Sequence, residues 1–344
     1  MPIPAYIRAR MEALSEVAKE TQKVLPDVLV QLPLLQAEDS QVYNLARLPQ
    51  LDASAPPRFE LASSSTTPSG PTKTYGTLVK VLNNDTFDAA IMMADSLTQP
   101  QQPSTTTTTA TATGAAAAST VPPATHRNQR IAVMNLASEK KPGGGWLTGA
   151  LAQEEALCYR SSLSLSLHKT YYPLEKLDAV YTRDVVVVRS SMDAGHQLLH
   201  TDVSPTPVGS LPVMSVISVA GIRGPELRKV THSSPFSSSG ARQEHEFKHA
   251  TDRDLTKAKM RLTLRVAALE RHELLVLGAL GCGAFHNPPG EVARCWLEVL
   301  QEPEFGGGRW FREIWFAVLD KRNEGNFEIF QQVLEGKEVG KVVV

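Results

Sequence analysis

Short, almost purely aliphatic runs that alternate with helix-like segments constrain the fold most strongly. Residues 274–277 read Leu-Leu-Val-Leu, and residues 185–188 are four consecutive valines. Strands that are buried on both faces have this composition, whereas strands with one exposed face alternate apolar and polar residues. Because such strands alternate with helices along the chain, we expect an α/β fold with a mixed, largely parallel sheet and helices on both of its faces.

The pattern predicts six strands and five helices between residues 77 and 334. Strands are expected at residues 77–82, 131–137, 184–189, 213–220, 274–278 and 313–319. Helices are expected at residues 86–97, 152–167, 254–271, 289–300 and 324–334. A further amphipathic helix is expected at residues 5–26, where apolar residues recur at helical spacing until Pro26 ends the pattern.

Changes in composition divide the chain into segments. Residues 1–75 are expected to form an N-terminal helical extension with a linker, residues 76–336 the α/β domain, and residues 337–344 a C-terminal tail. The Thr- and Ala-rich segment 98–126 offers little to bury, so it is predicted to be a disordered insertion. Residues 231–245 are expected to form a Ser-rich loop.

Charge and cysteine content argue against several classes of protein. Lys plus Arg total 35 and Asp plus Glu total 36, so the chain lacks the basic surplus with which proteins grip nucleic acid directly. No run approaches the roughly 20 apolar residues that a membrane helix needs. Three cysteines without a pairing pattern fit a reducing compartment. We therefore expect a soluble, monomeric, intracellular protein of the nucleus, the cytoplasm or both, with no membrane partner.

A glycine-rich loop follows the predicted strand at 131–137, which ends near Asn135. In α/β sheets, ligands bind outside the carboxyl ends of the strands. Consecutive glycines leave no Cβ in the way, so backbone amides can press against a ligand. Alone, the glycines would fit a flexible hinge and the acids a helix start, but two adjacent carboxylates at a fixed distance indicate a site. The residues concerned are Gly143, Gly144, Gly145, Gln153, Glu154 and Glu155.

A second loop follows the predicted strand at 274–278. It contains Gly281, Cys282, Gly283, Ala284, Phe285 and Asn287. Its glycines allow backbone amides to converge on an anion, and Phe285 offers an apolar face to a sugar or base. The alternative is a tight strand-to-helix turn with a core phenylalanine. We expect Cys282 to be a small buried residue rather than a nucleophile.

Residues 245–249 spell the H-E-x-x-H motif of zinc peptidases, with His245 and His249 as the two histidines. Charged residues flank this segment, instead of the apolar positions of a buried zinc-binding helix, and it follows the Ser-rich stretch. A solvated loop or helix start is therefore favoured over a zinc site. No metal and no cofactor are expected.

The segment 135–155 closely resembles the signature of microbial-type poly(ADP-ribose) glycohydrolases, a macrodomain family. Three glycines, a spacer of seven residues and Gln-Glu-Glu carry the resemblance, which extends over most of the chain outside the low-complexity inserts. It implies a three-layer α/β/α sandwich in which Glu155 is the catalytic acid and Glu154 binds the ribose beside the scissile bond. The other residues of both loops named above, and Asn135, are then expected to bind ADP-ribose. Trp146 and Thr148 depart from the family pattern, where a smaller aromatic residue and Asn are usual.

The resemblance implies a hydrolase that cleaves ribose–ribose O-glycosidic bonds of poly(ADP-ribose) and releases ADP-ribose. The substrate would be the polymer or ADP-ribosylated proteins, and a glutamate would serve as general acid and base without metal. Two alternatives stay open. Trp146 and Thr148 allow a mono-ADP-ribosyl hydrolase that acts on a modified protein or nucleic acid. A macrodomain that only binds ADP-ribose is disfavoured, because both Glu154 and Glu155 are present.

Overall fold

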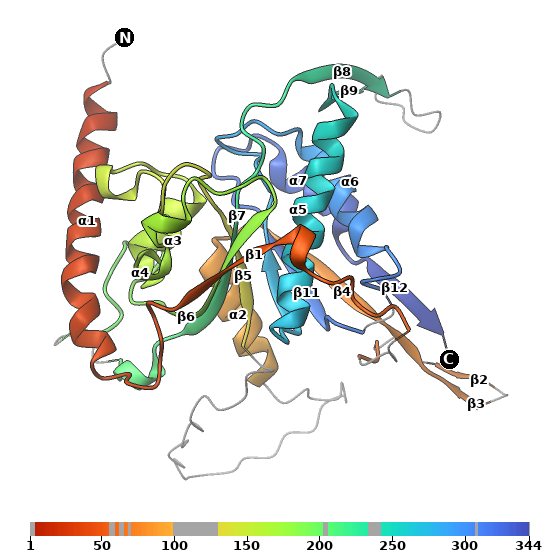
Figure 1. The fold of residues 1–344 in the computed structure, drawn as a ribbon, viewed down its shortest axis with the longest axis horizontal. Coiled ribbons are helices and arrows are strands. Elements are labelled where there is room, and N and C mark those ends of the chain that lie inside the picture. The colour runs from red at the N-terminus through yellow and green to blue at the C-terminus, as the bar shows by residue number, and fades with distance from the viewer. Residues whose placement is uncertain are drawn as a thin grey trace, which may run out of the picture.

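The computed structural model describes residues 4–54, 59–61, 65–67, 70–98, 130–201, 206–232, 242–306 and 309–343. Nearly all of the predicted insertion at 98–126, and much of the predicted Ser-rich loop at 231–245, lie outside the described residues. Figure 1 shows a central sheet with helices on both sides, α1 at one flank and the β8–β9 hairpin projecting from one end.

An eight-stranded sheet forms the centre of the protein, in the order β1-β6-β7-β5-β10-β11-β4-β12. The five neighbours from β7 to β4 pair in parallel, and the outer strands pair antiparallel. The predicted mixed, largely parallel sheet is therefore confirmed. The strands are β1 (Ser40–Asn44), β4 (Thr74–Leu82), β5 (Ala132–Leu136), β6 (Asp178–Val186), β7 (Val213–Val219), β10 (Leu274–Leu277), β11 (Glu313–Ala317) and β12 (Glu338–Val343).

Helices cover both faces of this sheet. Helices α5, α6 and α7 pack on one face, and α2, α3 and α4 pack on the other, with α1 outside α3 (Figure 1). This is the predicted three-layer α/β/α sandwich. The helices are α1 (Ala5–Leu29), α2 (Thr86–Thr98), α3 (Gln153–Arg160), α4 (Leu163–Ser166), α5 (Ala250–Leu269), α6 (Pro289–Leu300) and α7 (Asn326–Leu334). Two hairpins lie outside the sheet: β2 (Ser65–Thr67) with β3 (Gly70–Thr72), and β8 (Leu227–His232) with β9 (Arg242–Phe247).

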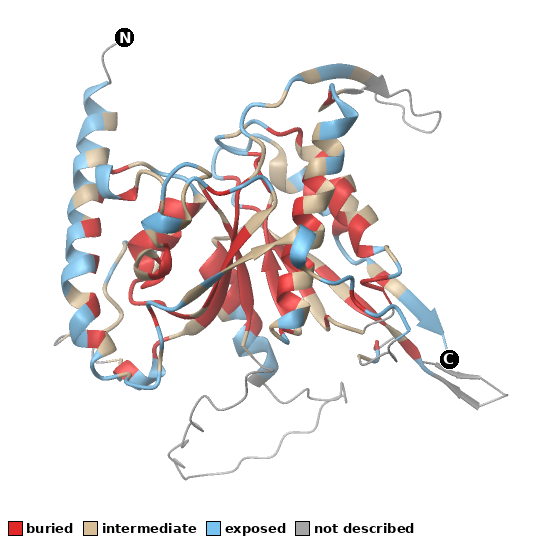
Figure 2. Cartoon of the chain, viewed as in Figure 1, coloured by how far each residue is buried: buried red, intermediate tan, exposed pale blue. Residues whose placement is uncertain are grey.

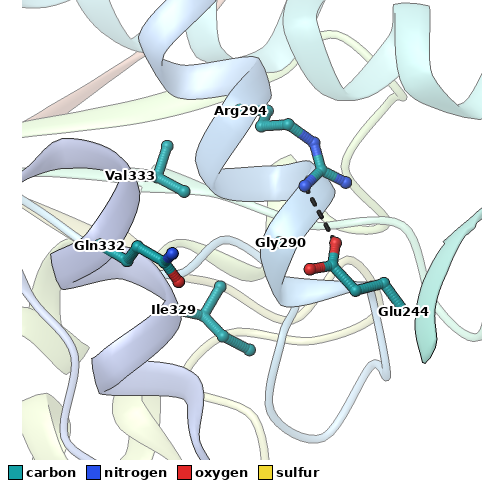
Figure 3. Close-up of a pocket in the computed structure, with 6 residues that line it drawn as sticks. All are labelled: Glu244, Gly290, Arg294, Ile329, Gln332 and Val333. Atoms are coloured by element: carbon teal, nitrogen blue, oxygen red, sulfur yellow. Dashed lines mark hydrogen bonds and ion pairs between the residues drawn. The ribbon is translucent and has the colours of Figure 1, made fainter. Parts of the chain in front are cut away.

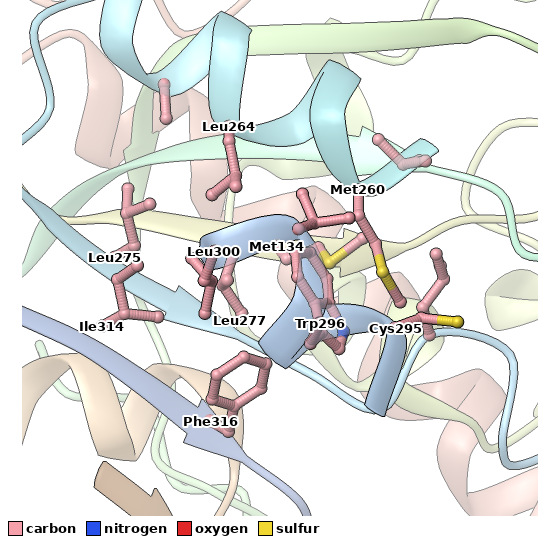
Figure 4. Close-up of a cluster of buried hydrophobic side chains, with 14 of the residues drawn as sticks. Met134, Met260, Leu264, Leu275, Leu277, Cys295, Trp296, Leu300, Ile314 and Phe316 are labelled. Atoms are coloured by element: carbon pink, nitrogen blue, oxygen red, sulfur yellow. The ribbon is translucent and has the colours of Figure 1, made fainter. Parts of the chain in front are cut away.

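Strand β10 shows why the central runs are aliphatic throughout. Leu275 and Leu277 point into the cluster that contains Trp296 of α6 (Figure 4). Leu274 and Val276 point the other way, into the cluster formed with α2 and α3. All four side chains are buried because each face of the strand carries a helical layer. Figure 2 shows that buried residues concentrate on the sheet and on the inner faces of the helices.

Several predicted elements have different bounds in the structure, and two of them show the reason. The strand expected at 184–189 begins earlier, because β1 pairs with its first half, and it ends at Val186. The helix expected at 152–167 is interrupted at Ser161, which forms a β-bridge with Val187. The Ser162 amide donates to the Val186 carbonyl at 3.0 Å. Pairing with the valine run therefore interrupts the helix at this point.

Helix α1 continues past Pro26, where the sequence pattern predicted its end. Proline lacks an amide donor, but its carbonyl still accepts, here from the Val30 amide at 3.0 Å. The last turn also buries Val28 beside Leu25, in a cluster with Val186 and Val188. Apolar contact with β6 therefore outweighs the hydrogen bond lost at the proline.

The sheet extends past both predicted boundaries of the α/β domain. Strand β1 lies in the predicted N-terminal extension and pairs with β6, and β12 lies in the predicted C-terminal tail and pairs with β4. These strands were missed because both are edge strands that mix polar and apolar residues. The core sheet thus reaches from Ser40 to Val343 instead of stopping at residues 76 and 336.

Candidate active site

Gln153 fastens the first turn of α3 to the carboxyl end of β5. Its Oε1 accepts from the Leu136 amide at 2.8 Å, and its Nε2 donates to the Met134 carbonyl at 2.8 Å. Nε2 also donates to the Thr86 hydroxyl at 3.1 Å. The side-chain amide of Gln153 therefore bonds within the protein and positions the first turn of α3.

Glu154 is buried between the strand end and the first loop. Its Oε2 accepts from the Ser138 amide at 2.7 Å, and its Oε1 accepts from Nδ2 of Asn135 at 3.3 Å. Burial raises the pKa of Glu154 to about 8, although these hydrogen bonds oppose the shift and the charge of Glu155 adds to it. The Oδ1 atom of Asn135 is buried and has no hydrogen-bond partner among the described residues.

Glu155 is held by the backbone of the glycine loop. Its Oε1 accepts from the Gly145 amide at 2.9 Å, while Oε2 makes no hydrogen bond within the described part of the chain. Gly144 has a φ of +58°, and a Cβ at this position would overlap Oε1 of Glu155. The glycine therefore permits both the left-handed backbone and the close approach of the carboxylate. The structure brings the two halves of the predicted motif together.

Trp146 belongs to the core and not to the ligand side of the loop. Its indole is buried, and a Cβ on Gly143 would lie 2.7 Å from the indole Cδ1. It meets Tyr159 edge-on, with ring centroids 6.1 Å apart. The departure from the family pattern at Trp146 thus fills space beneath the loop, whereas the Thr148 side chain is exposed and its hydroxyl donates to the Gly145 carbonyl at 2.9 Å.

Helix α1 packs directly on the short 3-10 helix η3 (Trp146–Thr148) of the same loop. The Ser15 hydroxyl donates to the Leu147 carbonyl at 2.9 Å. Gly149, with a φ of +79°, lies so close that a Cβ would be 2.5 Å from the Cα of Met11. The N-terminal helix is therefore part of the support of the glutamate-bearing loop, a role that its amphipathic pattern did not reveal.

Arg160 anchors the far end of α3. Its guanidinium is buried and forms ion pairs with Asp85 and Asp88, the latter at 2.6 Å. Its Nε also donates to the Arg189 carbonyl at 3.2 Å. Sequence reasoning missed this residue, because its two aspartate partners lie more than seventy positions away along the chain.

The second predicted loop is a tightly bonded turn at the same sheet edge. Nδ2 of Asn287 donates to the carbonyls of Ile222 at 2.6 Å and Gly281 at 3.1 Å, so this residue shapes the loop. Gly283 and Ala284 are exposed and Phe285 is half-buried, which leaves them accessible to a ligand. Cys282 is buried, and burial raises the pKa of its thiol, in keeping with a structural residue.

A third loop, after β7, joins the other two and was not predicted. Arg223 forms a bidentate ion pair with Glu139 of the first loop, at 2.7 and 3.0 Å. Its guanidinium carbon also lies 4.1 Å from the ring centroid of Phe285. The ion pair holds the pKa of Glu139 below its usual range. The position of Arg223 just beyond a predicted strand end was the available signal.

The H-E-x-x-H segment does not form a zinc-binding helix. His245 lies in strand β9, and His249 precedes α5, so the two histidines do not share a helical face. The cavity in Figure 3 is lined by the neighbouring Glu244 with α6 and α7, and contains none of the predicted site residues. Glu244 and Arg294 form an ion pair there at 3.1 Å. Within the described residues, no helix is long and apolar enough to cross a membrane.

Comparison with known proteins supports the relationship that the motif suggested. Residues 36–190 match the family model described as microbial-type PARG, catalytic domain. The fold is similar to poly(ADP-ribose) glycohydrolase from Thermomonospora curvata, with a TM-score of 0.59 and 21% identity over 93% of this chain and 99% of that one. It is also similar to the Deinococcus radiodurans enzyme in complex with ADP-ribose, with a TM-score of 0.50 and 25% identity over 74% and 83% of the two chains. No curated protein matches this sequence. Over residues 36–190, the chain is therefore similar to the catalytic domain of microbial-type poly(ADP-ribose) glycohydrolases.

Proposed function

We propose that this protein hydrolyses the ribose–ribose O-glycosidic bonds of poly(ADP-ribose) and releases ADP-ribose, with Glu155 as the general acid and base. The observation that carries the proposal is the placement of Glu155 in the family motif. One carboxylate oxygen is fixed by the Gly145 amide at 2.9 Å, and the other makes no hydrogen bond to the described residues. The second oxygen is therefore available to a substrate.

The reaction breaks the bond at an anomeric carbon through an oxocarbenium-like state. Protonated Glu155 gives its proton to the departing ribose hydroxyl, and the resulting carboxylate then takes a proton from the incoming water. One carboxylate thus acts in both steps, unlike the pair that most glycosidases use. General acid–base catalysis of this kind contributes about 10²–10⁴-fold to the rate.

Glu154 supplies the second part of the chemistry. With its pKa raised to about 8 by burial, it favours keeping a proton at neutral pH. In this state it can donate a hydrogen bond to a ribose hydroxyl beside the scissile bond. Its own carboxyl is oriented by Ser138 and Asn135, so the ribose would be held without rearrangement of the loop.

The two loops supply the binding walls of the proposed site. The loop at residues 143–145 would line the ribose and pyrophosphate, and the loop at residues 281–284 would contact the pyrophosphate from the other side. Phe285 would order the adenosine-side ribose. Gln153 and Asn287 hold these two loops in place, because their side-chain amides donate to backbone carbonyls.

We place this activity inside the cell, in the nucleus, the cytoplasm or both, where it reverses ADP-ribosylation of proteins, for example in the response to DNA damage. The three cysteines are free thiols and buried, which is compatible with a reducing compartment. We propose that a monomer is sufficient, because the residues assigned to the reaction all lie on one chain.

The test is incubation of the full chain with defined poly(ADP-ribose) and with mono-ADP-ribosylated peptides, followed by identification of the products by mass spectrometry. We expect free ADP-ribose from the polymer. Glu155→Gln should lose turnover and keep ADP-ribose affinity, whereas Glu16→Gln, an exposed change on α1, should keep both. Release from mono-modified peptide alone would favour the mono-ADP-ribosyl hydrolase, and binding without release would favour a reader. Full activity of Glu155→Gln would overturn the assignment of the acid.

A further inference from the structure

The three loops that surround the proposed site are linked by a single side chain. They follow β5, β7 and β10, which are neighbours in the sheet, so their carboxyl ends lie along one edge. Glu139 belongs to the first loop, Phe285 to the second and Arg223 to the third. Arg223 contacts both of the others, at 2.7 and 3.0 Å to the Glu139 carboxylate and at 4.1 Å to the Phe285 ring centroid.

The geometry of this link is unusually definite for a partly exposed side chain. A bidentate ion pair with a carboxylate fixes the orientation of the guanidinium plane. Stacking on an aromatic ring fixes the distance between the guanidinium and the ring. Arg223 is 46% exposed and Glu139 is 27% exposed. Most isolated surface ion pairs contribute little to stability. The arrangement is therefore better explained by what it positions than by what it stabilises.

The backbone beneath the link is held by other contacts. The Gly224 amide donates to the Phe285 carbonyl at 2.9 Å, and Asn287 donates to the Ile222 carbonyl at 2.6 Å. The Glu139 carbonyl accepts from the Leu174 amide at 2.9 Å. Loss of the Arg223 guanidinium should therefore leave the loops in place and free only the ring of Phe285.

We propose that Arg223 is a positioning residue for ADP-ribose, an inference that rests on the proposed function. Arg223 covers one face of Phe285 and so directs the opposite face toward the ligand. Glu139 holds Arg223 in place. Through Arg223, the loop that carries Glu139 and the loop that carries Phe285 are kept at a fixed separation. The position of Phe285 thereby selects a nucleoside diphosphate sugar whose two riboses match that separation.

Two variants distinguish positioning from simple attraction of a phosphate by a positive charge. Arg223→Lys keeps the charge but loses both the bidentate ion pair and the planar stack. Glu139→Gln releases Arg223 and removes a negative charge from the site. If Arg223 positions Phe285, both changes weaken ADP-ribose binding. If it only attracts phosphate, Arg223→Lys binds as the wild type does and Glu139→Gln binds more tightly.

The experiment is isothermal titration of the full-length variants with ADP-ribose, with kcat and KM measured on poly(ADP-ribose). We expect Arg223→Lys and Arg223→Gln to weaken binding and raise KM by about tenfold, and Glu139→Gln by about threefold, with kcat within twofold of the wild type. Arg228→Gln is the matched control, since Arg228 forms an exposed ion pair with Glu246 on the β8–β9 hairpin. It should bind as the wild type does.

The outcomes separate the two proposals. Suppose that the wild type hydrolyses the polymer. Normal ADP-ribose binding by Arg223→Lys, or tighter binding by Glu139→Gln, then overturns the positioning role alone. A loss of kcat without a loss of affinity does the same. A wild-type protein that neither binds ADP-ribose nor cleaves the polymer overturns the proposed function and this inference together. Thermal melting of each variant checks that the loops remain folded.

Discussion

The carboxylate of Glu155 accepts a hydrogen bond from the amide of Gly145, ten residues earlier in the chain, at 2.9 Å. The donor is backbone, so the position of the carboxylate depends on the conformation of the loop and not on another side chain. Gly144, whose φ is +58°, sets that conformation immediately beside the bond. The glycines are therefore as much a part of the proposed chemistry as the glutamate.

Gly144→Ala should disable the enzyme without unfolding it. The new Cβ would overlap Oε1 of Glu155 and lie 3.1 Å from Oε2 of Glu154, so the carboxylate of Glu155 must move away from the Gly145 amide. A displacement of about 1 Å at a reacting group lowers rates by about 10²-fold. We expect kcat on poly(ADP-ribose) to fall by at least that factor, measured by steady-state release of ADP-ribose.

The test of Gly144→Ala needs a control for backbone strain, because alanine is strained at a positive φ even where its Cβ meets no other atom. Gly336→Ala supplies it: Gly336 has a φ of +66° and nothing within 4 Å of an added Cβ. This variant should lose about 1 kcal/mol of stability and keep its activity. If Gly144→Ala were as active as Gly336→Ala, close approach to Glu155 would not matter for catalysis.

Glu154→Gln should make the protein more stable at neutral and alkaline pH while reducing its activity. The pKa of Glu154 is raised from 4.5 to about 8, so the folded state binds the proton more tightly than the unfolded chain does. The wild type therefore loses stability as the pH rises from 4.5 to 8. Glutamine carries no charge and avoids this loss. We expect a gain in unfolding free energy at pH 8 that shrinks as the pH falls and disappears near pH 4.5.

Urea unfolding of both proteins at several pH values measures this difference. Glutamine can be accommodated, because the unpaired Oδ1 of Asn135 can accept from its amide once the asparagine side chain turns over. A Glu154→Gln variant that is equally destabilised at all pH values would show that the buried carboxylate is satisfied in its charged form.

The layers of the fold and the two walls of the site were predictable for the same reason. Val276 and its neighbours are apolar on both sides because a helical layer covers each face, and such runs are visible in the sequence. Parallel strands end at one edge, so the loops at 143–145 and 281–287 were expected at the same edge of the sheet. Local composition was sufficient for these conclusions.

Contacts between distant residues were not predictable. Arg223 and Glu139 are 84 positions apart, and neither has a local pattern that names its partner. Polar residues in the motifs posed a related problem, since Gln153 and Asn287 bond the backbone while Glu155 keeps a free oxygen. The sequence shows which residues are polar, but only the fold decides which of them remain available to a ligand.

Acid should destabilise the protein through His272, which is buried between Tyr181 and the Arg130 carbonyl. Its Nδ1 donates to that carbonyl at 2.9 Å, and its Nε2 lies 2.9 Å from the Tyr181 hydroxyl. Burial lowers the pKa of His272 to about 4. The unfolded chain takes up a proton below pH 6.5 that the folded state refuses, so stability falls as the pH drops from 6.5 toward 4.

The expected slope from this one group is about 1.4 kcal/mol per pH unit. Urea unfolding of the wild type and His272→Gln between pH 7 and 4.5 should show a shallower acid slope for the variant. NMR titration of the His272 ring checks the cause directly. A ring that gains its proton near pH 6.5 in the folded protein would contradict this prediction.

Gly149→Ala should uncouple α1 from the glutamate-bearing loop. A Cβ there would overlap the Met11 carbonyl and lie 2.5 Å from its Cα, and backbone atoms of a long helix cannot yield as a flexible side chain can. We expect a loss of about 1–3 kcal/mol in unfolding free energy and a fall in kcat larger than any change in ADP-ribose affinity. Gly195→Ala is the control, since Gly195 has a φ of +85° and meets only the Gln197 side chain, at 3.4 Å. It reproduces the backbone strain without the clash, so it should melt lower and retain full kcat. Equal kcat in the two variants would mean that α1 supports the fold but not the position of Glu155.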